Sequence, residues 1–230
     1  MTTFGPLHLI ILAIILAACA GFSVLLRRNR IPARAVRLAV GWGIIVNELV
    51  WWAYRYSHEG LHAWNLPFQL CDASLWMSAL ACLTLARPLV EFAYFAGIAG
   101  AGMALLTPDL WSPWPSYPAI YFFLAHGGIV LAVSILVFGR ISPLRDGAVW
   151  RAFGLLLAFS AVAGALNALL ATNFMYLCRK PKVASLLDAL GPWPNYLAAG
   201  AAVALALFWL LWLPVRPRKE AAKLLKAGSS

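Results

Sequence analysis

The stretch of residues 117–138, YPAIYFFLAHGGIVLAVSILVF, runs for 22 residues without a single Lys, Arg, Asp or Glu. A helix needs about 20 apolar residues to cross the hydrocarbon core of a bilayer, so this stretch predicts a membrane-spanning helix. Six further segments fit the same scale, at 6–26, 36–56, 67–86, 88–107, 149–172 and 194–214. We therefore expect an all-α, polytopic membrane helix bundle of about seven transmembrane helices.

The composition agrees with this prediction. Hydrophobic residues make up 63% of the chain and charged residues 11%, and the mean hydropathy is +0.81. A soluble domain of this length would need far more charge to cover its surface. No linker-like stretch divides the chain, so we expect one transmembrane domain over 1–214 and a basic cytoplasmic tail over 215–230. The cysteine and histidine spacings match no metal motif, and we expect no metal and no cofactor.

The distribution of the positive charge indicates an orientation. The net charge is +10, but the basic residues sit in short gaps between apolar segments, which argues against a nucleic-acid partner. Fourteen Lys and Arg residues fall on the side of the first, third and fifth loops and the tail, against four on the other side. Loops rich in Lys and Arg stay cytoplasmic. We thus expect the N-terminus outside, the C-terminus inside, and a location in the bacterial inner membrane.

Strongly polar side chains lie inside or beside the predicted spans, where they are costly. Those in the predicted outer half are His8, Asn47, Glu48, Gln69, Asp72, Asp109, His126, Asn167 and Asn173. Their common depth predicts a polar cavity open to the outside, and dispersed hydrogen bonds between helices are the alternative. One acid, Glu91, lies on the inner side, and we expect a local ion pair with Arg87 four residues earlier.

Two of these outer residues suggest chemistry. Cys71 lies in the first turns of the third segment, with Pro67 as its expected first helical residue, and a helix N-terminus favours a thiolate. His126 lies at a similar depth. A thiol beside an imidazole is an arrangement for covalent acyl transfer, in which Asp72 or Asp109 would orient the ring. The alternatives are an apolar filler role for the cysteine, a core role for the histidine, or a disulfide between Cys71 and Cys178.

Basic residues before the last segment suggest a place for a lipid head group. Arg179 and Lys180 lie on the predicted outer side, against the overall charge bias. Such cations bind phosphate groups, and an ordinary basic loop that touches anionic lipids is the alternative.

Short motifs along the chain resemble a known family, the YwaF-like, transmembrane protein 164 family. They are LPFQLCD at 66–72, AHGG at 125–128, NFMYL at 173–177, Lys-Pro at 180–181, SLLD at 185–188 and LGPWP at 190–194. The resemblance implies a phospholipid acyltransferase that moves a fatty acyl chain onto a lysophospholipid, with Cys71 and His126 in the Cys and His roles. The family is distantly similar to the androgen-induced membrane hydrolases. This chain has Phe174 and Tyr176 in exchanged order relative to the usual motif.

We therefore expect a membrane lipid acyltransferase or transacylase whose partners are membrane phospholipids or lysophospholipids. Cys71 would be the nucleophile and His126 its base. Asn47, Glu48 and Gln69, with Asp72 and Asp109, are expected to support and orient the site, and Asn47 or Gln69 could also bind the oxyanion or head group. Residues expected to bind the substrate are Asn173, Tyr176, Arg179 and Lys180. A lipid ester hydrolase on the same residues, and a transporter or binding protein with an outward polar cavity, are the alternatives.

Overall fold

The computed structural model describes residues 1–110, 112–181 and 186–216, and every regular element in these ranges is helical. Residues 182–185, which include part of one quoted motif, and the predicted tail from 217 onward lie outside this description. Six of the described helices are long and apolar enough to cross a membrane, so the predicted helical membrane bundle is confirmed. They are α1 (Pro6–Arg27), α2 (Ala33–Glu59), Arg87–Leu106, Tyr117–Phe138, α7 (Ala148–Leu170) and α8 (Asn195–Trp212).

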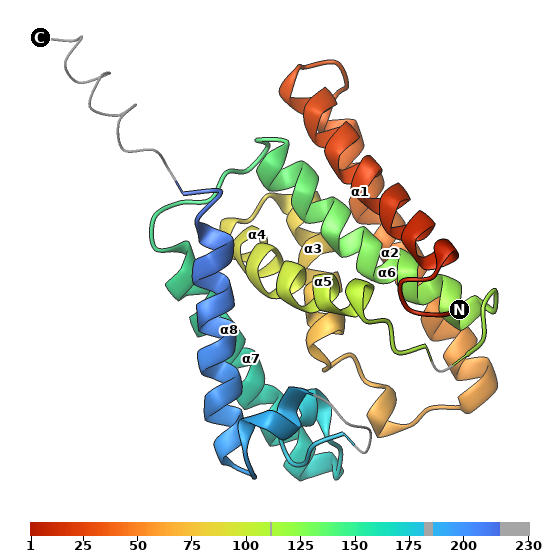
Figure 1. Cartoon of the computed structure of the whole chain (residues 1–230), viewed down its shortest axis with the longest axis vertical. Helices are drawn as coiled ribbons and strands as arrows, with labels where there is room; N and C mark the ends of the chain where they lie inside the picture. Colours follow the sequence, from red (N-terminus) through yellow and green to blue (C-terminus); the bar gives the residue numbers. More distant parts are fainter. Residues whose placement is uncertain (111, 182–185, 217–230) are drawn as a thin grey trace, which may run out of the picture.

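Two of these spans contain a π-helical turn. Arg87–Leu106 consists of α4 (Arg87–Phe92), η2 (Ala93–Gly97) and α5 (Ile98–Leu106), and Tyr117–Phe138 consists of α6 (Tyr117–Val133) and η3 (Ser134–Phe138). Short 3-10 turns complete the described chain at η1 (Ala63–Asn65), η4 (Phe174–Tyr176) and η5 (Leu186–Leu190). Figure 1 shows α7 and α8 together on one flank and α1 and α2 on the other, with the remaining helices between them.

The predicted third span is much shorter than expected. Only Leu70–Thr84 is helical, as α3, and its 15 residues fall below the length of the other spans. A helix of this length is about 22 Å long, against a hydrocarbon core of about 30 Å. Pro67 is not its first residue, because α3 begins at Leu70, after an extended N-cap residue, Gln69. Cys71 is therefore the second residue of α3.

The core forms where α3 packs between α2, η2 and α6. Ala79, Cys82, Phe95 and Ile129 are all at most 1% exposed there. Gly41 of α2 permits a close approach to α3, because a Cβ at that position would lie 3.0 Å from Cys82 Cβ. Small residues at such contacts let membrane helices pack closely.

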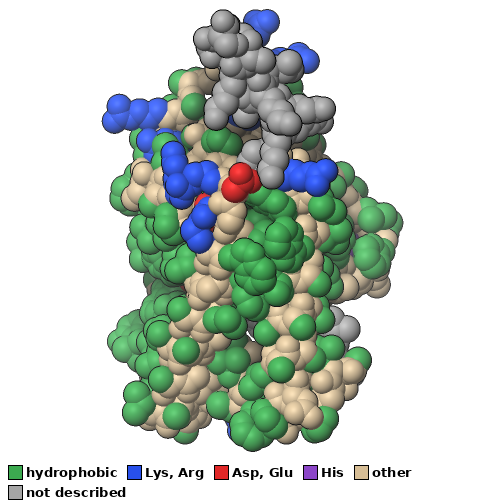
Figure 2. All heavy atoms as spheres, turned by 90° about the vertical axis from the view of Figure 1, so that its left-hand side faces the viewer, with side chains coloured by type: hydrophobic (Ala, Val, Ile, Leu, Met, Phe, Trp, Pro, Cys, Tyr) green, Lys and Arg blue, Asp and Glu red, His purple; other side chains and the backbone are tan. Residues whose placement is uncertain are grey.

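The helices on the two flanks of the bundle direct apolar side chains away from the core. Ile14 of α1, Leu169 of α7 and Leu210 of α8 are 63%, 79% and 61% exposed. Figure 2 shows the flank that carries α8 covered largely by hydrophobic side chains, with most of its Lys and Arg at one end. Such a surface suits contact with lipid rather than water.

Glu91 has a different partner from the one expected. Its carboxylate, 2% exposed, accepts two hydrogen bonds from the Arg151 guanidinium of α7, at 2.7 and 2.6 Å. Arg145 lies 3.9 Å away and Arg87 is not among the ion-paired residues described. The expected local pair is wrong because Glu91 lies on the buried face of α4, where a neighbouring helix supplies the cation.

Candidate active site

A cavity of about 540 Å³ opens at the start of α3. Walls come from the end of α2, the link that leads into α3, the end of α5, the middle of α6 and one residue of η4. Six of the residues singled out from the sequence line it: Gln69, Cys71, Asp72, Asp109, His126 and Tyr176. The fold thus brings Cys71 and His126, which are 55 positions apart in the chain, to the same cavity.

Cys71 lies where the backbone of α3 has unused donors. The first intrahelical bond of α3 runs from the Ala73 N–H to the Gln69 carbonyl, at 3.1 Å. The N–H groups of Leu70 and Cys71 therefore have no acceptor within their own helix, whereas the Asp72 N–H is paired with the Gln69 side chain in a capping box. Such groups, together with the helix dipole, favour negative charge at this end. The half-buried Cys71 side chain lies at this terminus and in the cavity wall.

Asp72 and Gln69 hold the start of α3 in place. Asp72 Oδ2 accepts a hydrogen bond from the Gln69 N–H at 3.1 Å. The Gln69 side chain reaches η4, where its Oε1 accepts the Met175 N–H at 2.8 Å. Asp72 thus caps its own helix, and Gln69 links the start of α3 to the segment before α8.

His126 is oriented by the backbone of its own helix. Its Nδ1–H donates to the Phe122 carbonyl at 2.7 Å, and the Phe122 ring packs against the imidazole at a centroid distance of 4.3 Å. Neither Asp72 nor Asp109 is the partner of this nitrogen, as the sequence had suggested, because a carbonyl one turn earlier is already within reach. With Nδ1 carrying the proton, a neutral imidazole has its lone pair on Nε2.

Tyr121 is a cavity residue that sequence reasoning missed. Its hydroxyl donates to Glu48 Oε2 at 2.6 Å, and its ring stacks on Trp51 at a centroid distance of 4.2 Å. Glu48 itself is 1% exposed and lies behind this wall rather than in it. Glu48 was the feature of the sequence that could have pointed to Tyr121, since a carboxylate buried in a span requires a hydrogen-bond donor from a neighbouring helix.

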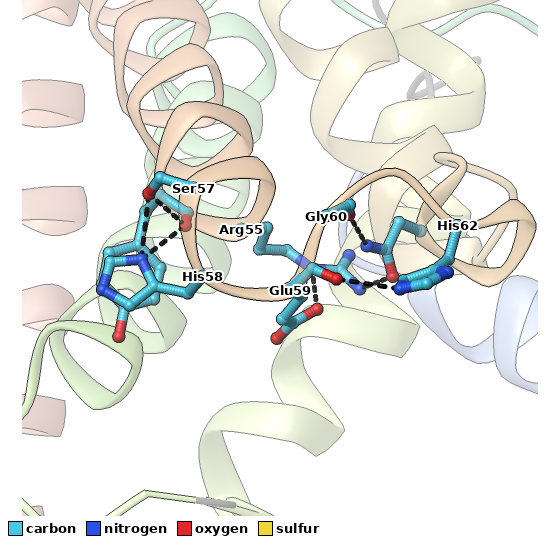
Figure 3. Close-up of polar contacts among 8 residues, drawn as sticks. Arg55, Ser57, His58, Glu59, Gly60 and His62 are labelled. Carbon is cyan, nitrogen blue, oxygen red and sulfur yellow. Dashed lines mark hydrogen bonds and ion pairs between the residues drawn. The ribbon is translucent and has the colours of Figure 1, made fainter.

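The end of α2 contributes Arg55 and Glu59 to the cavity wall, and Figure 3 shows the polar contacts made there. Arg55 pairs with Glu59 at 3.3 Å and also donates to the Asn65 side chain. His58 and His62 make only local bonds in Figure 3. His58 bonds to the Tyr54 carbonyl at 2.8 Å and to the Ser57 hydroxyl at 2.9 Å, and His62 bonds to the Glu59 carbonyl at 2.8 Å. In the described part of the chain, no group of three or more His, Cys, Asp or Glu residues could hold a metal ion.

Several residues expected at the site lie elsewhere. Asn173 fixes a turn, since its Oδ1 accepts the N–H groups of Cys178 and Arg179 at 3.0 and 3.2 Å. Lys180 pairs with Asp188 at 3.7 Å. Neither Asn173, Arg179, Lys180, Asn47 nor Glu48 lines the cavity. Among the residues with described positions, Arg55 is its only Lys or Arg, so Arg179 and Lys180 are not part of this cavity's wall.

Other polar residues of the predicted outer half have structural roles. His8, fully buried, accepts the Phe4 N–H at 2.9 Å and donates to the Leu105 carbonyl at 2.8 Å, which joins α1 to α5. Asn167 binds both the N–H and the carbonyl of Phe174, at 2.6 and 3.1 Å. The expectation that all these residues face one cavity is therefore wrong for His8 and Asn167.

The cysteines are unpaired in the structure. All four are free, and Cys71 and Cys178 line two different cavities. The alternative of a disulfide between Cys71 and Cys178 is therefore wrong for this structure.

A protein-family model, described as the TMEM164 family, matches residues 3–212. This range contains all six membrane-spanning helices and α3. Searches of curated proteins and of solved structures gave no significant match.

Proposed function

We propose that this chain, which belongs to the TMEM164 family, is a membrane-embedded lipid acyltransferase or transacylase that acts on acyl esters of phospholipids or lysophospholipids. One observation carries the proposal. Cys71, at the N-terminus of α3, and His126, whose Nε2 has the lone pair, line one cavity inside a membrane bundle. A nucleophile, a base and unused backbone donors are the elements of covalent acyl transfer.

In the first half-reaction, His126 Nε2 takes the proton of the Cys71 thiol as sulfur attacks the ester carbonyl. The carbonyl oxygen becomes an oxyanion, and the N–H groups at the start of α3 are placed to stabilise it. When the C–O bond breaks, the leaving alcohol takes the proton from His126. The acyl group is then held on Cys71 as a thioester.

In the second half-reaction, the hydroxyl of an acceptor lipid gives its proton to His126 and attacks the thioester. The sulfur leaves as a thiolate and recovers the proton from His126, which restores both side chains. If water is the acceptor, the same site acts as a lipid ester hydrolase. The choice between the two outcomes depends on how well the cavity excludes water.

We also propose a side for the reaction. The excess of Lys and Arg in the first, third and fifth loops and the tail supports a cytoplasmic position for those segments. The cavity lies at the other end of the spans, so it would open toward the periplasmic or exoplasmic side of a bacterial cytoplasmic membrane.

The test is an acyl-transfer assay on purified protein in lipid nanodiscs. Phospholipid labelled in its acyl chain is supplied with and without lysophospholipid, and products and peptide adducts are followed by mass spectrometry. We expect labelled product and an acyl adduct on Cys71, with both absent in Cys71→Ala. Cys19→Ala is the matched control, because that thiol is also free but lines neither this cavity nor the one that Cys178 lines.

His126→Gln separates the base from the nucleophile. The glutamine keeps a polar side chain of similar reach but cannot take the thiol proton. Loss of a general base costs about 10²–10⁴-fold in rate, so the adduct is expected to form far more slowly. Full acyl transfer in both Cys71→Ala and His126→Gln would reject the Cys–His mechanism, whereas no labelled product and no adduct from the wild type would favour a transporter or a binding protein.

A further inference from the structure

A second cavity, of about 670 Å³, lies between α7 and α8. Its walls include residues one turn apart on each helix: Leu157, Ala161 and Gly164 on α7, and Leu197, Gly200 and Ala204 on α8. The small residues leave space where larger side chains would meet. We name this cavity the α7–α8 groove.

The groove suits a hydrocarbon occupant. The two hydroxyl groups in its wall are already satisfied, since Ser160 donates to the Leu156 carbonyl at 2.8 Å and Tyr196 donates to the Tyr176 carbonyl. No Lys, Arg, Asp or Glu is among its described lining residues. Its volume falls within the range of roughly 300–1,000 Å³ that is usual for small-molecule sites.

The groove shares two walls with the candidate active site. In α3, Leu70 lines the groove while its neighbours Gln69 and Cys71 line the active-site cavity. In the segment after α7, Met175 lines the groove while Tyr176 lines the cavity. The hydrogen bond from the Met175 N–H to Gln69 Oε1 joins these two walls. The same two short segments thus separate an apolar space from a thiol.

We infer that the α7–α8 groove holds one fatty acyl chain of the lipid whose ester reacts at Cys71. This inference rests on the proposed acyl transfer. The ester of a lipid with its chain in the groove would lie at the boundary between the two cavities, where Cys71 is found. A fatty acyl chain that moves from the bilayer into the groove leaves one apolar medium for another, so hydrophobic burial adds little binding free energy. The groove would therefore distinguish acyl chains by how well their length and shape fit it.

Two glycine substitutions test the inference without disturbing the backbone. A Cβ at Gly200 would meet no other atom within 4 Å, and a Cβ at Gly164 would meet only Leu177 Cδ1, at 3.8 Å. Gly164→Leu and Gly200→Leu therefore fill the groove from opposite sides. Gly154→Leu is the matched control, since Gly154 lies on α7, has equal space and lines neither cavity.

The assay uses vesicles that contain phosphatidylcholines with short, medium and long saturated chains in equal amounts, together with lysophospholipid. Mass spectrometry gives the ratio of long to short chains transferred. We expect this ratio to fall about tenfold in either groove variant, the scale on which apolar pockets discriminate chain length. In Gly154→Leu it is expected to match the wild type. An unchanged ratio in both groove variants, at wild-type thermal stability, would overturn the inference.

A second measurement separates this inference from the proposed function. Phosphatidylcholine with a photoreactive group at the end of one chain is incorporated into the vesicles, and cross-linked peptides are mapped in the Cys71→Ser protein. Cross-links concentrated on 157–164 and 197–204, and lost in Gly200→Leu, support the groove even if the wild type transfers no acyl group. Cross-links spread equally over the outward faces of α1 and α8 would show annular lipid only and would overturn it.

Discussion

The hydroxyl of Tyr121 on α6 donates a 2.6 Å hydrogen bond to Oε2 of Glu48 on α2. The other carboxylate oxygen accepts the Trp52 indole N–H at 2.9 Å. Glu48 is 1% exposed, and no Lys or Arg forms an ion pair with it in the described ranges. Two neutral donors, Trp52 of α2 and Tyr121 of α6, therefore satisfy a carboxyl group inside a membrane span. The pair also fixes the Tyr121 ring in the wall of the candidate active-site cavity.

Substitution of Tyr121 by Phe is expected to destabilise the protein. It removes one hydrogen bond to a buried carboxyl group, at a cost of about 1.5–3 kcal/mol. Thermal unfolding in detergent should show a lower midpoint for Tyr121→Phe than for the wild type. The exposed Asp146→Ala is the control and should leave the midpoint unchanged. Equal midpoints for Tyr121→Phe and the wild type would mean that the hydroxyl is not engaged as described.

Substitution of Arg151 is expected to destabilise the protein more than substitution of Arg87. Arg151→Met leaves Glu91 buried without its two donated hydrogen bonds. Breaking a fully buried pair costs about 3–5 kcal/mol; because the Arg151 side chain is 41% exposed, we expect about 1–3 kcal/mol. Equilibrium unfolding of Arg151→Met, Arg87→Met and the double variant with Glu91→Gln measures the coupling. A larger loss of unfolding free energy in Arg87→Met than in Arg151→Met would instead support the local pair of Arg87 and Glu91 suggested by the sequence.

Substitution of Asn167 by Ala is expected to loosen the segment 173–180. The amide holds both backbone groups of Phe174, and the next two residues, Met175 and Tyr176, have φ values of +55° and +53°. Non-glycine residues in this region persist only when the surrounding structure holds them. Hydrogen exchange should accelerate in 173–180. Thr107→Ala, whose hydroxyl bonds only to its own helix, should leave this segment unchanged.

The cysteines are expected to react with a maleimide in a fixed order. Cys178 is exposed, Cys71 is half-buried, and Cys19 and Cys82 are 7% and 0% exposed. Mass spectrometry of the folded protein should show modification at Cys178 first and at Cys71 second. Cys19 and Cys82 should react only after unfolding. Spheroplasts treated with a membrane-impermeant maleimide test the proposed side, since Cys178 must then be labelled without permeabilisation.

The sequence predicted the long spans well because apolar length is a direct physical requirement of the bilayer. The segment predicted at 194–214 is helical over Asn195–Trp212, and that at 6–26 over Pro6–Arg27. The start of α3 was misplaced because Pro67 resembles a first helical residue. The effective signal was the pair Gln69 and Asp72, three residues apart, in which the acid accepts the N–H at the N-cap.

The site was only partly predictable for a related reason. A polar residue within a span must find a hydrogen-bond partner, but the sequence does not show which neighbour supplies it. Asn167 and Asn173 satisfy nearby backbone, His8 joins two helices, and Glu48 binds Tyr121. Cys71 and His126 line one cavity because α3 and α6 are packed together. That contact depends on helix packing, which spacing along the chain does not determine.

The short length of α3 has a consequence for the surrounding membrane. The other spans have 18 to 27 residues, whereas α3 has 15, so at this one position the protein offers less hydrophobic length than its neighbours. Hydrophobic mismatch is relieved by local thinning of the bilayer, which would bring interfacial ester groups down toward the thiol. The rate of the proposed reaction should thus depend on the thickness of the host bilayer. Lengthening α3 by one turn before Leu70 would remove both the mismatch and the space proposed for the reaction.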